Sequence, residues 1–273
     1  MKSSKIAFIG GYAPVSSSIF SLYAKKNNDS IFINLSDNKV KKRKNLFDFK
    51  IYELLKIINL LNDRGIKNIC FIGKVFRPDL SNIKIDNLLI KYIGQIQMAY
   101  LKGDEYLLKL VIDIFKNQNF NIKSLINVAP SFFIGKNYKN IILNNNNFDE
   151  NDIKKGVRLL NSISKYDNAQ SAVISKGYIL GIEAVEGTDK LLKRVAAEKK
   201  ILKLKKNEGV LIKIPKKDQS IYADLPTIGP RTLILASKAK LNGIAIKKNK
   251  TIIYDRDKCI ELANSLKLNL YLL

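Results

Sequence analysis

Three carboxylates stand close together in the stretch GYILGIEAVEGTDKLLKR, where an apolar run gives way to a glycine and a helix-like segment. They are Glu183, Glu186 and Asp189. Carboxylate oxygens bind hard cations such as Mg²⁺ and also orient substrate hydroxyls. Glu183 follows a strand-like run and Glu186 falls in a tight turn, which indicates a metal or substrate site. The alternative for Thr188 or Asp189 is helix capping, in which the side-chain oxygen accepts a hydrogen bond from a backbone amide.

A second segment, ADLPTIGPRTLILASKAKLNGIAI, places Asp224 before a turn built from Pro226, Thr227 and Gly229. Pro230 then takes the first helical position, where a missing amide costs no hydrogen bond. The free amides and the dipole at this helix start favour a phosphate against residues 227–229. Asp224 would face the same phosphate. The alternative is that Asp224 only organises its own turn.

The elements that must position these residues follow an α/β pattern, because short β-branched runs alternate with longer segments of helical period. We expect an N-terminal Rossmann-like parallel sheet with flanking helices and a C-terminal mixed α/β domain. In the first half, strands are expected at KIAFI, SIFINL and NICFIG, and helices near residues 15–26, 50–63, 86–101 and 104–117.

Two glycine-containing loops, residues 10–14 and 73–78, fall where predicted strands end. Open α/β sheets present ligand-binding loops at such strand ends. Neither loop has a GxGxxG or Walker pattern, and a tight turn alone also requires glycine. Ligand contact by Gly10 and Gly11 and a purely conformational role are therefore both open.

A domain boundary is predicted near residues 133–147, which contain GKNYKN and a run of asparagines, and it divides the chain into residues 1–135 and 136–273. In the second half, 171–174 and 178–184 are expected to form a hairpin joined at Lys176 and Gly177. Helices are expected over 152–166, 188–201, 230–240 and 255–267, strands at GVLIKI and LNLYLL, and a strand pair at GIAI with TIIY.

The absence of histidine limits the chemistry that the chain can perform. Serine triads with histidine and His-ligated zinc sites are excluded. The two cysteines, Cys70 and Cys259, lack metal-ligand or redox spacing, and we expect inert core thiols. Any metal should be a hard, oxygen-seeking ion such as Mg²⁺.

The formal charge of +24 raises the alternative of a nucleic-acid-binding protein. Only seven of the 48 basic residues are Arg, however, and the Lys are scattered among Asn and Ile. Recognition of bases and bidentate phosphate contacts depend on Arg, so we expect no nucleic-acid partner. The cluster Lys39, Lys41, Lys42, Arg43 and Lys44 fits either an anionic membrane face or a solvated loop.

Hydropathy favours a folded protein without a membrane-spanning helix, since 46% of residues are hydrophobic and no uncharged apolar run approaches about 18 residues. The apolar run before Gly10 is too short for a signal peptide. We therefore expect a cytoplasmic protein.

The stretches EAVEGTD, followed by an Arg in the next helix, and DLPTIG, followed by Thr232, closely resemble two signatures of one family. It is the UDP-2,3-diacylglucosamine pyrophosphatase family of lipid A biosynthesis, which is unrelated to calcineurin-like phosphoesterases. Weaker matches occur in the same order along nearly the whole chain, at IGGYAP, GKVFRP, GDEYLL, DIKKG and DNAQSAVI.

The resemblance implies a two-domain α/β hydrolase whose lipid-linked sugar nucleotide lies between the domains. Mg²⁺ would help water attack the phosphorus nearer uridine, giving UMP and 2,3-diacylglucosamine 1-phosphate (lipid X). A hard cation on carboxylates neutralises diphosphate charge and can lower the pKa of its bound water, so the chemistry of the residues agrees. The alternative is a non-catalytic protein that binds a nucleotide or phosphosugar.

The residues expected at the site combine those that the residue pattern indicates with those that only the resemblance implies, among them Gln170 and Lys213. Asp224, Glu186 and Asp189 are the catalytic candidates, and Glu183, Glu186, Asp189 and Asp224 are the candidate metal ligands. The substrate-binding candidates are Gly10, Gly11, Lys74, Arg77, Gln170, Thr188, Lys213, Thr227 and Gly229.

Membrane contact is expected as well, because the acyl chains of the substrate must be reached from the bilayer. We expect peripheral association with the anionic inner membrane and an apolar cleft between the domains, while homo-oligomerisation is left open by the sequence. Three positions depart from the family pattern: Ser220 replaces an Asp, Tyr222 an Arg, and Ala169 a Gly. A lost essential Asp would leave substrate binding with poor turnover.

Overall fold

The computed structural model describes residues 5–36, 44–75, 86–135, 147–166, 169–201, 203, 207–217, 219–220, 222 and 224–273. The chain divides into two compact units. The N-terminal unit comprises Met1–Pro130 and Ser220–Asp224, and the C-terminal unit comprises Ser131–Gln219 and Leu225–Leu273. The chain therefore returns to the N-terminal unit for one short segment, which ends at Asp224, the first residue of the DLPTIG signature.

The N-terminal unit contains a five-stranded sheet of order β3-β2-β1-β4-β5 in which every pairing is parallel. Its strands are β1 (Ile6–Gly10), β2 (Ile31–Asn34), β3 (Leu46–Asp48), β4 (Asn68–Phe71) and β5 (Asn121–Ile122). The predicted Rossmann-like parallel sheet is confirmed. The strand order reverses between β1 and β4, and open α/β sheets bind ligands at such a switch point.

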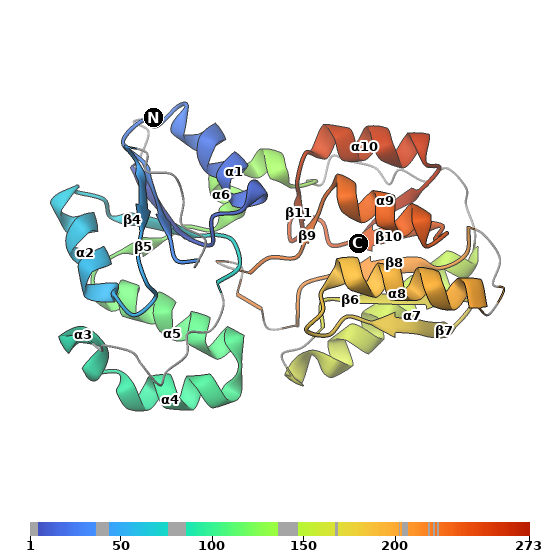
Figure 1. Cartoon of the computed structure of the whole chain (residues 1–273), viewed down its shortest axis with the longest axis horizontal. Helices are drawn as coiled ribbons and strands as arrows, with labels where there is room; N and C mark the ends of the chain where they lie inside the picture. The colour runs from blue at the N-terminus through green and yellow to red at the C-terminus, as the bar shows by residue number, and fades with distance from the viewer. Residues whose placement is uncertain are drawn as a thin grey trace. The chain divides into compact units, whose positions relative to one another are not determined.

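Helices cover both faces of this sheet, which explains why β1 and β2 are buried along their whole length. They are α1 (Pro14–Ala24), α2 (Leu54–Asp63), α3 (Asn87–Ile90), α4 (Ile93–Lys102), α5 (Asp104–Asn117) and α6 (Leu125–Val128). The ring of Phe20, on α1, packs edge to face against the rings of Phe8 in β1 and Phe32 in β2. On the other face, α2 and α5 contribute Ile57 and Phe115 to the core (Figure 1).

The helix predicted over residues 86–101 is divided in the structure. Lys91 and Tyr92 form a turn between α3 and α4, so the chain changes direction there. The side chain of Asp86 caps α3 by accepting a hydrogen bond from the amide of Leu89 at 2.8 Å. Hydrophobic spacing continued across this turn, which is why the sequence predicted one helix.

The C-terminal unit has a mixed sheet of order β12-β10-β8-β6-β7, in agreement with the prediction. Its strands are β6 (Ser171–Ser175), β7 (Tyr178–Ile182), β8 (Val210–Lys213), β10 (Gly243–Ile246) and β12 (Asn269–Leu272). β8, β10 and β12 are parallel, and β6 runs antiparallel to β7 and β8. Lys176 and Gly177 both have positive φ, of 50° and 79°, and form the predicted hairpin turn.

The expected pairing of GIAI with TIIY is wrong. β10 already has β8 and β12 on its two edges, so no edge remains for another strand. The TIIY stretch instead contains β11 (Ile252–Ile253), which pairs in parallel with β9 (Thr227–Ile228) in a separate two-stranded sheet.

Helices also cover both faces of the C-terminal sheet (Figure 1). α7 (Asn147–Ile163) packs Ile153 and Leu160 against one face. The other face is covered by α8 (Thr188–Ile201), α9 (Pro230–Lys238) and α10 (Arg256–Ser265), whose buried side chains share one core with Val173, Leu211 and Ile244. Within the described residues, no helix is long and apolar enough to span a bilayer.

Candidate functional site

Four polar side chains gather at one edge of the C-terminal sheet. Ser171 begins β6 directly opposite Lys213, the last residue of the antiparallel strand β8. Glu183 follows the end of β7, and Thr188 begins α8. These four residues, which we call the carboxyl-edge cluster, therefore lie where the parallel strands of the sheet end.

A chain of hydrogen bonds links the cluster. The Nζ atom of Lys213 donates to Thr188 Oγ1 at 2.6 Å and to Ser171 Oγ at 3.2 Å. Thr188 Oγ1 in turn donates to Glu183 Oε1 at 2.9 Å. The hydroxyl of Thr188 thus connects a lysine ammonium to a carboxylate.

The cluster is largely shielded from water, since the side chains of Lys213 and Glu183 are only 7% and 14% exposed. Their Nζ and Oε2 atoms are 3.8 Å apart, so each charge is compensated by the other. Among the described residues, no hydrogen-bond donor reaches Glu183 Oε2. A buried carboxylate oxygen without a donor is costly, so Glu183 stays a candidate site residue.

Glu186 holds the turn before α8. Its Oε1 atom accepts a hydrogen bond from Arg194 Nη2 at 3.0 Å, and its Oε2 atom accepts one from the amide of Ala184 at 3.1 Å. The Arg194 contact, followed by bonds from backbone amides, lowers the pKa of Glu186. Arg194 also donates to the carbonyl of Ile182 at the end of β7. Glu186 is therefore an ionised carboxylate engaged in shaping its own turn.

Asp189 connects the two segments that stand out in the sequence. Its Oδ2 atom lies 2.7 Å from Nε of Arg231, in the first turn of α9. α8 and α9 lie side by side in the C-terminal unit (Figure 1). The acidic turn and the proline-flanked turn are thus joined by one ion pair.

The start of α9 matches the prediction, with Pro230 as its first residue. Thr227 lies in β9, and its hydroxyl donates to the carbonyl of Leu225 at 3.3 Å. The amide of Gly229 donates to Thr232 Oγ1 at 3.3 Å. The local turn therefore uses the hydroxyl of Thr227 and the amide of Gly229, two of the groups that were expected to contact a phosphate.

Asp224 belongs to the N-terminal unit, whereas the other three candidate carboxylates belong to the C-terminal unit. Its φ of 56° lies in the left-handed region, which Asp adopts more readily than most residues. Tyr222 packs against the N-terminal core, and its amide donates to Ser220 Oγ at 3.2 Å. Ser220 and Tyr222 thus stabilise this segment although they depart from the family pattern.

The glycines at the switch point permit two loops to touch through their backbones. A Cβ atom at Gly10 would lie 1.9 Å from the carbonyl oxygen of Ile72, and one at Gly11 would lie 2.1 Å from that of Lys74. A Cβ atom at Gly73 would lie 2.2 Å from the oxygen of Gly11. This close approach explains the glycines without a ligand, and their contact with substrate stays a prediction.

Asn34 at the end of β2 fixes the neighbouring loops. Its Oδ1 atom accepts hydrogen bonds from the amide of Tyr12 at 3.0 Å and the hydroxyl of Ser36 at 2.7 Å, while Nδ2 donates to Asp48 Oδ1 at 2.7 Å. The loops after β1, β2 and β3 are therefore held together. Lys74 is exposed beside them, and Arg77 and residues 39–43 of the basic cluster lie outside the described residues.

Gln170 supports the loop that follows β8. Its Nε2 atom donates to Gln219 Oε1 at 3.1 Å, and the same oxygen accepts the amide of Lys216 at 2.8 Å. Gln170 immediately precedes Ser171 of the carboxyl-edge cluster, so this loop and the cluster are adjacent.

Three of the four candidate metal ligands have a cationic partner in the C-terminal unit. Glu183 faces Lys213, Glu186 faces Arg194, and Asp189 faces Arg231. Within the part of the chain that the structure describes, no three acidic, Cys or His side chains form a group that could hold a metal ion. These residues alone do not fit a preformed Mg²⁺ site, and the magnesium expectation stays a prediction.

Both cysteine thiols are buried. Burial raises the pKa of Cys70 to about 12 and, together with the nearby charge of Asp255, that of Cys259 to about 12. The thiolate is the reactive form, so these side chains fit the expected inert core thiols.

Two site residues were not identified from the sequence. Ser171 was missed because its position opposite Lys213 depends on strand register, although it follows Gln170 within a strand-like run. Arg231 was missed because its contact with Asp189 depends on how two helices pack. Its location in the first turn of a helix next to an acidic segment was the available signal.

The fold and site define a class of protein: a two-unit α/β protein with polar side chains at the carboxyl ends of parallel strands, where open α/β sheets bind their ligands. Models of the LpxI N-terminal and C-terminal domains match residues 5–132 and 141–271. The chain is 33% identical over 225 residues to the UDP-2,3-diacylglucosamine pyrophosphatase LpxI of Caulobacter vibrioides, covering 81% of this chain and 79% of that protein. The chain belongs to the LpxI family, which confirms the resemblance seen in the sequence.

Proposed function

We propose that this chain is a UDP-2,3-diacylglucosamine pyrophosphatase, a hydrolase of lipid A biosynthesis. The observation that carries the proposal is the match of both LpxI domain models, together with the pyrophosphatase at 33% identity over most of the chain. The hydrolysis adds one water across the diphosphate. The oxygen of water bonds to the phosphorus nearer uridine, the bond from that phosphorus to the bridging oxygen breaks, and UMP and 2,3-diacylglucosamine 1-phosphate result.

The carboxyl-edge cluster is the proposed diphosphate-binding element of the C-terminal unit. Lys213 supplies a positive charge in a shielded setting, where its attraction for phosphate oxygens is stronger than in water. Thr188 presents a hydroxyl that Lys213 and Glu183 hold in place. The first turn of α9, which follows Thr227 and Gly229, adds the positive end of a helix dipole.

Asp224 is the proposed catalytic carboxylate, in the role of orienting the attacking water and accepting its proton. Its left-handed backbone conformation is the kind of local strain that clusters at functional sites. Glu186 and Asp189 are further proposed catalytic carboxylates, and their ion pairs with Arg194 and Arg231 keep both oriented.

Mg²⁺ is the proposed cofactor, because carboxylate and phosphate oxygens are the ligands that it prefers. When bound, it would neutralise diphosphate charge and polarise the reacting phosphorus. The proposed ligands are Glu183, Glu186, Asp189 and Asp224, although each of the first three already faces a cation. The roles proposed for Lys213, Thr188 and Asp224 do not depend on the metal.

A cytoplasmic location with peripheral association to the anionic inner membrane completes the proposal. The substrate carries two acyl chains, so the enzyme must work where these chains leave the bilayer. The excess of basic over acidic residues, 48 against 24, favours attraction to an anionic surface.

The activity is tested by measuring UMP release from detergent-dispersed UDP-2,3-diacylglucosamine, with Mg²⁺ and then with EDTA. We expect UMP and the acylated sugar 1-phosphate in equal amounts, loss of product with EDTA, and recovery when Mg²⁺ is restored. UDP-N-acetylglucosamine, which lacks the acyl chains, serves as the control substrate. Binding of UDP-sugar without any UMP release would reject the hydrolase and support a non-catalytic binding module.

A further inference from the structure

The segment from Asn87 to Gly103 exposes large apolar side chains on the N-terminal unit and contains no acidic residue. Met98 and Leu101 on α4 are 57% and 84% exposed. Ile90, at the end of α3, and Ile93, at the start of α4, are exposed as well. We call Ile90, Ile93, Met98 and Leu101 the α4 face.

Helical spacing places the residues of α4 on two distinct sides. Ile93, Gln97 and Leu101 follow one another at intervals of four and form one outward row, since residues four apart share a helix face. The adjoining outward row contains Gly94, Met98 and Lys102. Ile96 and Ala99 point inward, where Ile96 packs against the N-terminal core and Ala99 is buried.

α4 is thus an amphipathic helix of unusual orientation. It packs on α5 through a small inner side and presents its larger apolar side chains outward. Side chains scattered singly on a surface need no explanation, but four exposed apolar side chains within twelve residues of α3 and α4 are a candidate interaction site.

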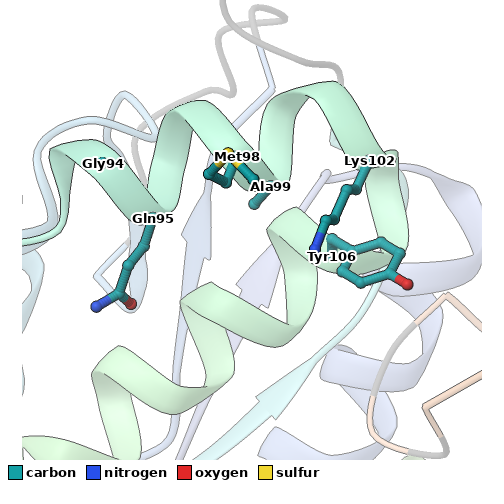
Figure 2. A pocket seen from close by; sticks show the side chains of 6 residues that line it. All are labelled: Gly94, Gln95, Met98, Ala99, Lys102 and Tyr106. Atoms are coloured by element: carbon teal, nitrogen blue, oxygen red, sulfur yellow. The ribbon is translucent and has the colours of Figure 1, made fainter.

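A shallow hollow of about 420 Å³ lies beside the α4 face. Its lining comes from Gly94, Gln95, Met98, Ala99, Lys102 and Tyr106 (Figure 2). The ammonium of Lys102 is 5.3 Å from the centre of the Tyr106 ring, and that of Lys109 is 5.7 Å from it. A tyrosine ring between two lysines, next to exposed aliphatic side chains, is the combination found where proteins meet the boundary between lipid tails and headgroups.

We infer that the α4 face docks onto an anionic phospholipid membrane, with Met98 and Leu101 entering the headgroup region and Lys91 and Lys102 contacting lipid phosphates. Interfacial helices bind in this way, with an apolar face buried at the acyl boundary and lysines at its edge. The inference deepens the proposed function, on which it rests, by naming the surface through which an enzyme for a diacylated substrate reaches the bilayer.

Charge favours an anionic membrane, rather than a second copy of the chain, as the partner of the α4 face. A twofold interface uses the same patch on both subunits, so it would bring Lys91 and Lys102 of both copies, four lysines in all, into one interface. Acidic residues flank the segment on both sides. The carboxylate of Asp86 accepts hydrogen bonds from the amides of Leu89 and Leu55, and Glu105 in the first turn of α5 pairs with Lys109 at 2.8 Å. No carboxylate of the segment itself is available to offset that repulsion.

The test is co-sedimentation of the full chain with sucrose-loaded vesicles of phosphatidylcholine with one quarter phosphatidylglycerol, compared with phosphatidylcholine alone. The wild type should bind the anionic vesicles at least tenfold more tightly. The double variant Met98→Gln/Leu101→Gln should lose about tenfold in partition coefficient, and Lys91→Gln/Lys102→Gln should lose the preference for anionic lipid. Ile201→Gln, which alters another exposed apolar residue at the end of α8, should bind as the wild type does.

UMP release from detergent-dispersed substrate separates this inference from the proposed function. All variants should keep their activity in detergent within about twofold of the wild type, because none alters the carboxyl-edge cluster or Asp224. Unchanged vesicle binding by the Met98/Leu101 variant would overturn the inference. So would a concentration-dependent dimer in analytical ultracentrifugation that this variant abolishes, since that outcome assigns the α4 face to a second copy.

Discussion

Arg231 Nε lies 2.7 Å from Asp189 Oδ2 and joins the first turns of α8 and α9. The two residues are 73% and 38% exposed, and ion pairs in such settings contribute little to stability. We expect their effect to be geometric, because the pair links the first turns of two neighbouring helices, one of which begins with Thr188 of the carboxyl-edge cluster.

The Arg231→Met variant tests this geometric role. Its free energy of unfolding should change by less than about 1 kcal/mol, since the pair is exposed. Its kcat/KM for UDP-2,3-diacylglucosamine should fall at least tenfold if the alignment of α8 and α9 positions the diphosphate. Arg158→Met, on the exposed side of α7, should change neither quantity. Equal activity of the two variants would remove Arg231 from the site.

The effect of replacing Lys213 on the free energy of unfolding should depend on whether Glu183 is present. The Lys213→Met variant leaves the charge of Glu183 poorly solvated, and loss of one partner from a buried pair costs about 3 kcal/mol in the free energy of unfolding. The double variant Lys213→Met/Glu183→Gln should recover most of this loss while remaining inactive. Urea denaturation and UMP release measure the two effects separately. Recovery of activity in the double variant would show that Lys213 only balances Glu183 and does not contact substrate.

Asp224→Asn removes the carboxylate while preserving the backbone, because Asn adopts the left-handed conformation as readily as Asp. We expect kcat to fall at least 100-fold, with KM changed less than threefold and unfolding unaffected. Asp255→Asn is the matched control, since Asp255 also has a left-handed backbone, with φ of 53°. Steady-state assays of both variants at saturating Mg²⁺ decide the matter, and comparable activity of the two would show that Asp224 has no catalytic role.

Much of the fold followed from the sequence because the long elements carry strong local signals. β1 and the first three residues of β2 are apolar and lie between polar segments, as buried parallel strands do. β3, β5, β9 and β11 are only two or three residues long and are strands through pairing alone. Pairing between distant segments leaves no periodic signal in such short runs.

The candidate site was predictable in residue types but not in contacts. Glu183, Thr188 and Asp189 stand out because carboxylates and a hydroxyl surround a glycine between a strand and a helix. The partners of these residues, Lys213 and Arg231, lie on elements far along the chain, and strand register and helix packing bring them near. The return of Asp224 to the N-terminal unit likewise depends on tertiary structure and has no local signature.

Because the two switch-point loops approach each other closely, a side chain at Gly73 should destabilise the fold. A Cβ atom there would lie 2.2 Å from the Gly11 oxygen, at a φ of 82°. Gly65 also has a positive φ, of 63°, but nothing lies within 4 Å of its Cβ position. Gly65→Ala should therefore cost about 1 kcal/mol, from backbone strain alone. Gly73→Ala should cost at least about 2 kcal/mol more, because the loops must separate, and equal melting temperatures of the two variants would contradict this account.

Asp149 should make the stability of the chain depend on pH. It is buried in the first turn of α7, where its carboxylate accepts hydrogen bonds from Tyr271 at 2.6 Å and from Asn242. Burial raises the pKa of Asp149, assisted by the charge of Asp152, and outweighs the two hydrogen bonds that lower it. The folded chain thus holds this proton more tightly than the unfolded chain.

The sign of the effect follows from this difference. The stability linked to Asp149 is fully present below about pH 4, the usual Asp pKa, and is lost as the pH rises through the raised value in the folded chain. Asp149→Asn resembles the protonated carboxyl and has no proton to lose. Relative to wild type, its free energy of unfolding should increase between pH 4 and pH 7 in urea titrations, whereas Asp257→Asn, at an exposed position, should show no such trend. A variant that becomes less stable than wild type as the pH rises would show instead that the ionised carboxylate holds the Tyr271 and Asn242 side chains in place.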